Sequence, residues 1–85
     1  MSRKGTFVDK TITDDTVLDL KDCGDVYIEN NGQMTVYFSK KAIGAGQNFR
    51  PTNTAIFDDR IELKFIDPII GVKEVYVSYV KYHAI

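Results

Sequence analysis

Apolar and polar residues alternate with a period of two along most of this chain. The pattern is clearest over residues 26–29, 34–39 and 60–65. Alternation places successive side chains on opposite faces of a β-strand. The Val, Ile, Thr, Tyr and Phe content of these segments also suits a pleated, half-buried surface. No segment keeps a helical period of 3.6 residues for long enough to predict a helix, so the pattern indicates an all-β protein.

Turn-forming residues divide the rest of the chain into further short strands. Strands are predicted over residues 5–13, 16–20, 54–57 and 73–83, with a long loop at 40–53 that holds one short strand near Phe49. Seven or eight short strands are typical of a small antiparallel β-sandwich of jelly-roll-like form. A small closed barrel is the alternative. At 85 residues, the segment 1–85 is expected to be a single β domain.

Asn30-Asn31-Gly32 is the strongest local turn signal, because Asn-Gly accepts the positive φ angles of a type I′ turn. We therefore predict a hairpin that joins residues 26–30 to 33–39. Its inward set would be Val26, Ile28, Met34, Val36 and Phe38. Tyr27, Glu29, Thr35 and Tyr37 would share the opposite face.

The last predicted strand, residues 73–83, changes its apolar parity near Ser78-Tyr79. Val75 and Val77 lie on one parity, whereas the apolar residues further along lie on the other. This change predicts a β-bulge there, or burial on both faces of the strand.

Charge and composition disfavour several classes of partner. Eleven basic and twelve acidic residues give a net charge of −1, so no basic surface for nucleic acid is predicted. No apolar run approaches the length of a membrane span or of a signal peptide, so synthesis in the cytoplasm and no membrane partner are expected. Cys23 is the only cysteine, and we interpret it as a packing residue rather than as half of a disulfide.

No catalytic or metal-binding constellation is recognisable. The single histidine, His83, has no second ligand of its kind, and the paired carboxylates Asp14-Asp15 and Asp58-Asp59 are better explained as turn residues. Gly44-Ala45-Gly46 lacks the rest of a phosphate-binding fingerprint. We expect no enzyme activity, no catalytic residue, no metal site and no cofactor.

Tyrosines are the most suggestive polar aromatic residues, because such rings stack on sugars and are frequent at subunit interfaces. They could equally be half-buried side chains that cover a second core. The candidate interface or binding residues are Tyr27, Tyr37, Tyr76, Tyr82, Phe49 and Arg50, the last two from the 40–53 loop.

The order of features resembles small β-sandwich virion proteins of tailed phages, of the capsid-decoration and head-fibre type. The resemblance rests on the Thr-rich opening at residues 11–20, the Asn-x-Gly segment at 26–32 and the Gly-x-x-Phe segment Gly46-Gln47-Asn48-Phe49. The strands at 61–65 and 75–79 complete it. Arg50-Pro51 and the polar stretch after them depart from that pattern.

The resemblance implies a non-enzymatic structural protein of a phage particle that forms a homo-oligomer, dimer or trimer, and docks on other virion proteins. It would be made in the host cytoplasm and reside in the virion. The alternative is a small binding module for a glycan or a host protein, which would use the 40–53 loop and the tyrosines. An exposed edge strand would favour assembly, whereas a concave tyrosine groove would favour ligand binding.

Overall fold

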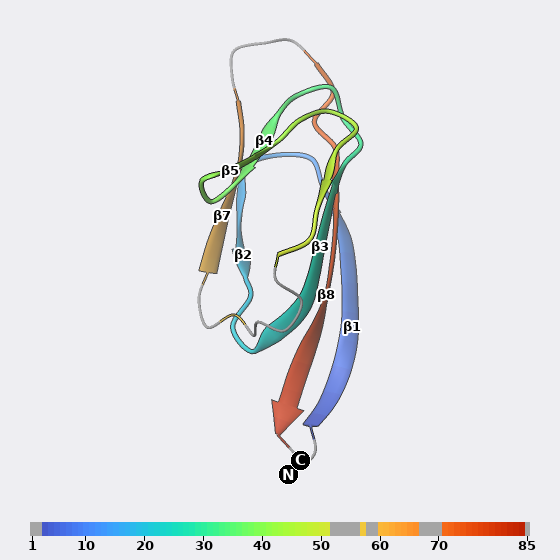
Figure 1. Ribbon diagram of the computed structural model, residues 1–85, viewed down its shortest axis with the longest axis vertical. Helices are drawn as coiled ribbons and strands as arrows, with labels where there is room; N and C mark the ends of the chain where they lie inside the picture. Colours follow the sequence, from blue (N-terminus) through green and yellow to red (C-terminus); the bar gives the residue numbers. More distant parts are fainter. Residues whose placement is uncertain (1–2, 52–56, 58–59, 67–70, 85) are drawn as a thin grey trace.

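The strands pair into two antiparallel sheets of four (Figure 1). The computed structural model describes residues 3–51, 57, 60–66 and 71–84. One sheet, here the long sheet, has the order β1–β8–β3–β6, and the other, the short sheet, has the order β2–β7–β4–β5. The strands are β1 (Arg3–Ile12), β2 (Thr16–Asp19), β3 (Cys23–Asn30), β4 (Val36–Phe38), β5 (Lys41–Ile43), β6 (Asn48–Phe49), β7 (Arg60–Phe65) and β8 (Val75–Ala84). The predicted β-sandwich is confirmed, and the closed barrel is wrong.

The topology is that of a long hairpin rolled up on itself. Strand β1 pairs with β8, β2 with β7, β3 with β6, and β4 with β5. The contacts of β3 with β8 and of β4 with β7 then join these pairs into the two sheets. This strand order is the jelly roll, which the strand count and spacing of the sequence anticipated.

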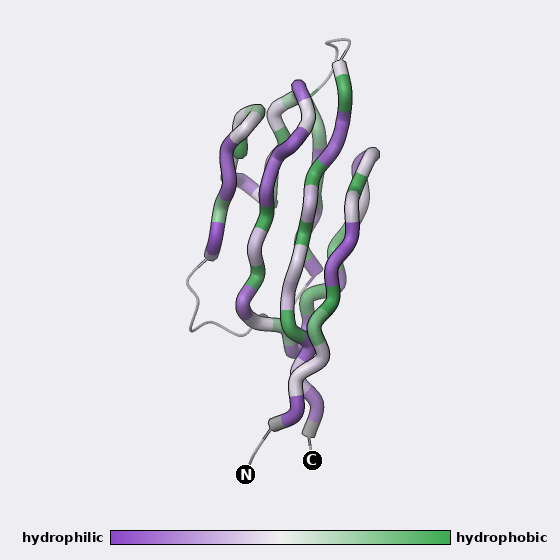
Figure 2. The backbone as a smooth tube through the Cα atoms, turned by 90° about the vertical axis from the view of Figure 1, so that its right-hand side faces the viewer, coloured by the Kyte–Doolittle hydropathy of each residue, from purple (hydrophilic) through white to green (hydrophobic). Residues whose placement is uncertain are grey.

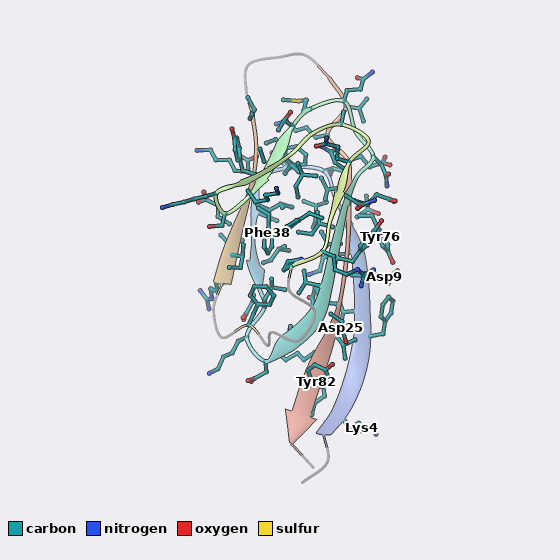
Figure 3. The ribbon with its side chains drawn as sticks, in the orientation of Figure 1. Lys4, Asp9, Asp25, Phe38, Tyr76 and Tyr82 are labelled. Carbon is teal, nitrogen blue, oxygen red and sulfur yellow. The ribbon has the colours of Figure 1, made fainter. Side chains whose placement is uncertain are left out.

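The core lies between the two sheets and is built from the inward parity of each strand. Phe38 of β4 stands at its centre (Figure 3), with its ring centroid 5.9 Å from that of Phe49 and 6.3 Å from that of Phe57. The buried apolar side chains are Leu18, Leu20, Cys23, Val26, Ile28, Met34, Val36, Phe38, Ile43, Leu63, Phe65, Val75, Val77 and Tyr79. All five residues predicted to face inward from 26–38 are in this set.

The predicted hairpin at Asn30-Asn31-Gly32 is wrong, because β3 and β4 belong to different sheets. Neither Asn31 nor Gly32 has the positive φ that a type I′ turn requires. Instead, the Asn31 amide donates to the Glu74 carbonyl at 2.9 Å, so this segment runs beside the chain that enters β8. A Cβ at Gly32 would lie 2.7 Å from the Glu74 nitrogen. Glycine is needed there for close backbone approach rather than for turn geometry.

Asn30 holds the crossing from one sheet to the other. Its side chain is fully buried, and its Nδ2 donates to the carbonyls of Met34 at 2.7 Å and Ile43 at 2.9 Å. Its Oδ1 accepts from the Gly32 amide at 3.1 Å. Each polar atom of the side chain is therefore satisfied, as burial demands. Asn30 thus ties the end of β3 to Met34, just before β4, and to Ile43, the last residue of β5.

A β-bulge lies next to Ser78-Tyr79, where the sequence predicted one, but it is in β3 and not in β8. The register of β3 against β8 shifts between Gly24 and Tyr27, so that Asp25 and Val26 face the single residue Tyr79. Asp25 takes up the bulge with a φ of 51°. The β8 residues at this point, Ser78 and Tyr79, are both buried, which explains the change of apolar parity.

Some strand limits differ from those predicted. Strand β3 begins at Cys23, inside the expected turn, and β5 occupies part of the expected 40–53 loop. A tight hairpin joins β4 to β5 through Ser39 and Lys40, with Ser39 at a φ of 55°. The strand predicted over 54–57 lies outside the described residues except for Phe57, which bridges to Cys23.

Candidate interaction surfaces

The outer face of the long sheet brings three of the predicted site residues together. Tyr27 of β3 and Tyr76 of β8 contact edge to face, with ring centroids 6.4 Å apart. The guanidinium of Arg50, which directly follows β6, lies 5.0 Å from the centroid of Tyr27. Figure 2 looks onto this face and shows hydrophilic and hydrophobic positions alternating along its strands. We call Tyr27, Tyr76 and Arg50 the aromatic patch.

Carboxylates anchor the two tyrosines of the patch. The Tyr27 hydroxyl donates to Glu29 at 3.0 Å within β3, and the Tyr76 hydroxyl donates to Asp9 of β1 at 3.2 Å. Figure 3 shows Tyr76 and Asp9 on the side of the long sheet away from Phe38. Burial raises the pKa of each phenol, and the hydrogen bond to the carboxylate raises it further. Both rings are thus fixed in place as neutral phenols.

Tyr82 lies further along the same face of β8 and is anchored in the same way. Its hydroxyl donates to the bulge residue Asp25 at 3.0 Å. Gly5 of β1 is directly opposite Tyr82, and a Cβ there would lie 2.6 Å from Val80 and 3.5 Å from the Tyr82 ring. Because Gly5 has no side chain, Val80 and Tyr82 of β8 can lie across β1 at this position.

Tyr37 and Phe49 do not join the patch. Tyr37 is in the short sheet, opposite Ala42 and Lys64, so the prediction that it shares a face with Tyr27 is wrong. It follows from the mistaken hairpin. Phe49 points inward, because it is paired with the buried Ile28, and its ring packs on Phe38 with the Lys41 ammonium 5.5 Å from its centroid. Phe49 is a core residue at the rim.

The edge formed by β1 is a second candidate surface, which the sequence did not reveal. Among the described residues, β1 pairs with β8 alone, through ten consecutive positions from Arg3 to Ile12. Phe7, in the middle of the strand, is 63% exposed. The other three edge strands are β2, β5 and β6, with four, three and two residues. The edge amides and carbonyls of β1 are thus the longest open hydrogen-bonding row in the described part of the chain.

The 40–53 loop lines a depression of about 360 Å³ between β5 and β6. Its lining residues are Lys41, Ala42, Ile43, Gln47, Asn48 and Phe49, and none of the candidate tyrosines contributes. Gln47 closes the loop on itself, because its side chain accepts from the Gly44 amide at 2.8 Å. The depression carries one aromatic and one cationic residue, and it is separate from the aromatic patch.

Cys23 and His83 lie apart from the aromatic patch. Cys23 is fully buried, and burial raises the pKa of its thiol, which favours the protonated form. His83 contacts the Thr6 hydroxyl, with 3.3 Å between Nε2 and Oγ1. No group of three or more His, Cys, Asp or Glu side chains in the described residues is placed to hold a metal ion. The same residues contain no helix long and apolar enough to cross a membrane.

The fold and surfaces define the chain as a small jelly-roll β-sandwich with an open edge strand and an aromatic patch on one sheet. Comparisons with protein-family models, with curated proteins and with solved structures found no match to this chain.

Proposed function

We propose that this protein is a non-enzymatic structural protein of a phage particle, a capsid-decoration, head-fibre or head/tail accessory subunit that assembles with copies of itself. The observation that carries assembly is the open edge of β1, which is ten residues long and exposes Phe7. Monomeric proteins protect such edges with short strands, bulges, proline or charged side chains such as lysine. Of these devices β1 has only the charged side chains, at Lys4, Asp9 and Lys10. The described edge strands other than β1 are short, and β1 has neither a bulge nor a proline.

The particle assignment rests on the sequence resemblance, and the fold agrees with it. Jelly rolls build many viral capsid domains. Fold alone does not determine function, since lectins use the same topology. Other virion proteins would contact the remaining exposed surfaces, including the aromatic patch. The near-neutral net charge of −1 fits protein partners better than nucleic acid.

The test is the solution mass of the purified protein, measured by light scattering after size exclusion across a tenfold or wider dilution series. We expect a dimer or trimer that persists on dilution. A monomer at all concentrations would overturn assembly through β1. Incubation with purified capsids of a candidate phage, followed by sedimentation, then tests docking on the particle.

One observation favours the second candidate, a glycan-binding module. Tyr27 and Tyr76 are half-buried, and each holds a carboxylate at its hydroxyl, so rings and hydrogen-bond acceptors lie side by side as in sugar sites. Calorimetric titration with a panel of oligosaccharides tests this candidate. Binding that Tyr76→Ala abolishes and Tyr37→Ala leaves unchanged would support it, because Tyr37 is a tyrosine of the other sheet. If no oligosaccharide gave a heat of binding, the glycan-binding candidate would be ruled out.

A further inference from the structure

Three surfaces remain open for assembly: the depression between β5 and β6, the aromatic patch, and the β1 edge. The depression is lined mainly by side chains that already pack or bond within their own loop. The patch has its hydroxyls and its one cation satisfied internally. The β1 edge differs from both, because its outward backbone groups and the Phe7 ring have no partner among the described residues.

We propose that β1 pairs antiparallel with β1 of a second copy about a two-fold axis at Thr6, which joins the two long sheets into one eight-stranded sheet. This inference rests on the proposed self-assembly and names its surface and register. A two-fold axis normal to a sheet keeps each face on its own side, so each residue lies opposite a residue of the same parity. Only registers centred on a residue are therefore allowed.

Charge and shape select among these registers. Centring on Phe7 would place Lys4 of each copy opposite Lys10 of the other. Like charges directly opposite each other are destabilising. Centring on Val8 would set the exposed Phe7 ring opposite the Asp9 carboxylate. Centring on Gly5 would pair only residues 3–7. The register centred on Phe7 is disfavoured by charge repulsion. The register centred on Val8 leaves the Phe7 ring uncovered, and the register centred on Gly5 pairs too few residues.

Centring on Thr6 avoids all three faults. Phe7 lies opposite Gly5 of the second copy on the outer face, where the Val80 and Tyr82 side chains of β8 lie over the glycine and offer the ring an apolar contact. Lys4 lies opposite Val8, and Lys10 lies just outside the paired segment, which covers residues 3–9. In this register the exposed Phe7 ring is covered by the second copy.

Disulfide trapping tests the register. A residue on the two-fold axis faces its own copy with about 4.5–5.5 Å between Cα atoms, a separation that a disulfide spans. We expect Thr6→Cys to cross-link into a covalent dimer under mild oxidation, and Phe7→Cys and Val8→Cys not to do so efficiently. The wild type is the control, because its one cysteine, Cys23, is fully buried. Efficient cross-linking of Phe7→Cys or Val8→Cys, with little in Thr6→Cys, would overturn the register.

Charge insertion tests the surface independently. Thr6→Lys places two ammonium groups opposite each other at the axis, and it should raise the dimer dissociation constant about tenfold or more. Thr11→Lys is the matched control, since Thr11 is also an exposed β1 threonine but falls outside the paired segment. An oligomer that persists in Thr6→Lys with no cross-link in Thr6→Cys would overturn this interface and leave self-assembly standing. A wild-type monomer would overturn both.

Discussion

Strand β8 has two neighbours, β3 and β1, and the two are held by different means. The inward residues of β3 lie in the core, where Val26 and Ile28 are buried, and its pairing with β8 is interrupted by a bulge. The pairing of β1 with β8 is longer and unbroken, yet most β1 side chains are exposed. A long run of backbone pairing therefore does not require that the strand bury many side chains. The core fixes β3, whereas β1 has a surface free for another chain.

The largest expected effect comes from substituting a core residue of β3. Ile28→Ala should lower the free energy of unfolding by about 2–5 kcal/mol, because it removes a fully buried side chain and leaves a cavity. Phe7→Ala, in the monomer, should change it by about 0.5 kcal/mol or less, since the ring is 63% exposed. Urea unfolding of both variants measures the difference. Equal losses would show that β1 is part of the stabilising core.

A second effect concerns the crossing where β3 leaves the long sheet. Asn30→Ala removes the donor for two buried carbonyls, those of Met34 and Ile43, and should cost about 2–3 kcal/mol. Asn31→Ala is the control, because the Asn31 side chain is exposed and its backbone amide keeps its bond to Glu74. Thermal unfolding of the pair is the measurement. A small loss for Asn30→Ala would mean that water or a rearranged backbone replaces the side chain.

A smaller effect should appear on β1 alone. Tyr76→Phe removes the hydroxyl that reaches across to Asp9, so the β1 amides paired with β8 should exchange with solvent faster, by about two- to tenfold. Tyr27→Phe removes a bond that stays within β3 and should leave β1 exchange unchanged. Hydrogen exchange followed by NMR resolves the two strands. Equal acceleration in both variants would contradict the separate anchoring of β1.

The smallest expected effect is on titration. The pKa values of Tyr27 and Tyr76 are raised above the ordinary phenol value by burial and by their carboxylate partners. A raised phenol pKa means that the folded state retains its proton longer than the unfolded state does. The resulting stabilisation is complete below the unfolded pKa of about 10 and is lost as pH rises through the folded pKa.

Replacing one acceptor separates the two phenols. Asp9→Asn removes the β1 charge beside Tyr76 and should lower the pKa of Tyr76 toward its ordinary value, while the pKa of Tyr27 stays raised. NMR titration of the ring carbons reports each tyrosine separately. If both phenols shift together, the coupling between the rings exceeds the effect of the individual carboxylates.

The alternation of apolar and polar residues along the strands predicted most of the fold. The inward parity of β3 and β4 was correct because burial of every second residue is recorded locally in the sequence. The partner of each strand is not recorded locally. Asn-Gly favours a turn, but at Asn30-Asn31-Gly32 the tertiary contacts with residues 72–74 give glycine and asparagine other roles. The error in the hairpin then misplaced Tyr37.

The candidate surfaces were predictable in part. Tyr27 and Tyr76 were recognised as candidate polar aromatic residues, and Arg50 as a candidate in the 40–53 loop, but their proximity was not predicted. The inward face of Phe49 could not be predicted, because the two residues of β6 are too few to show a parity. The open edge of β1 had no signal in the sequence, since the edge position of a strand depends on the order of strands in the sheet.

The rolled hairpin also determines how the chain must fold. Strands β4 and β5 are joined by two residues and can meet quickly, whereas β1 and β8 stand at opposite ends of the sequence and require closure of nearly the whole chain. Loop-closure entropy of this kind slows folding, and all-β domains with such distant pairings fold in milliseconds to seconds. We therefore expect the pairing of β1 with β8 to form after the local hairpin of β4 and β5.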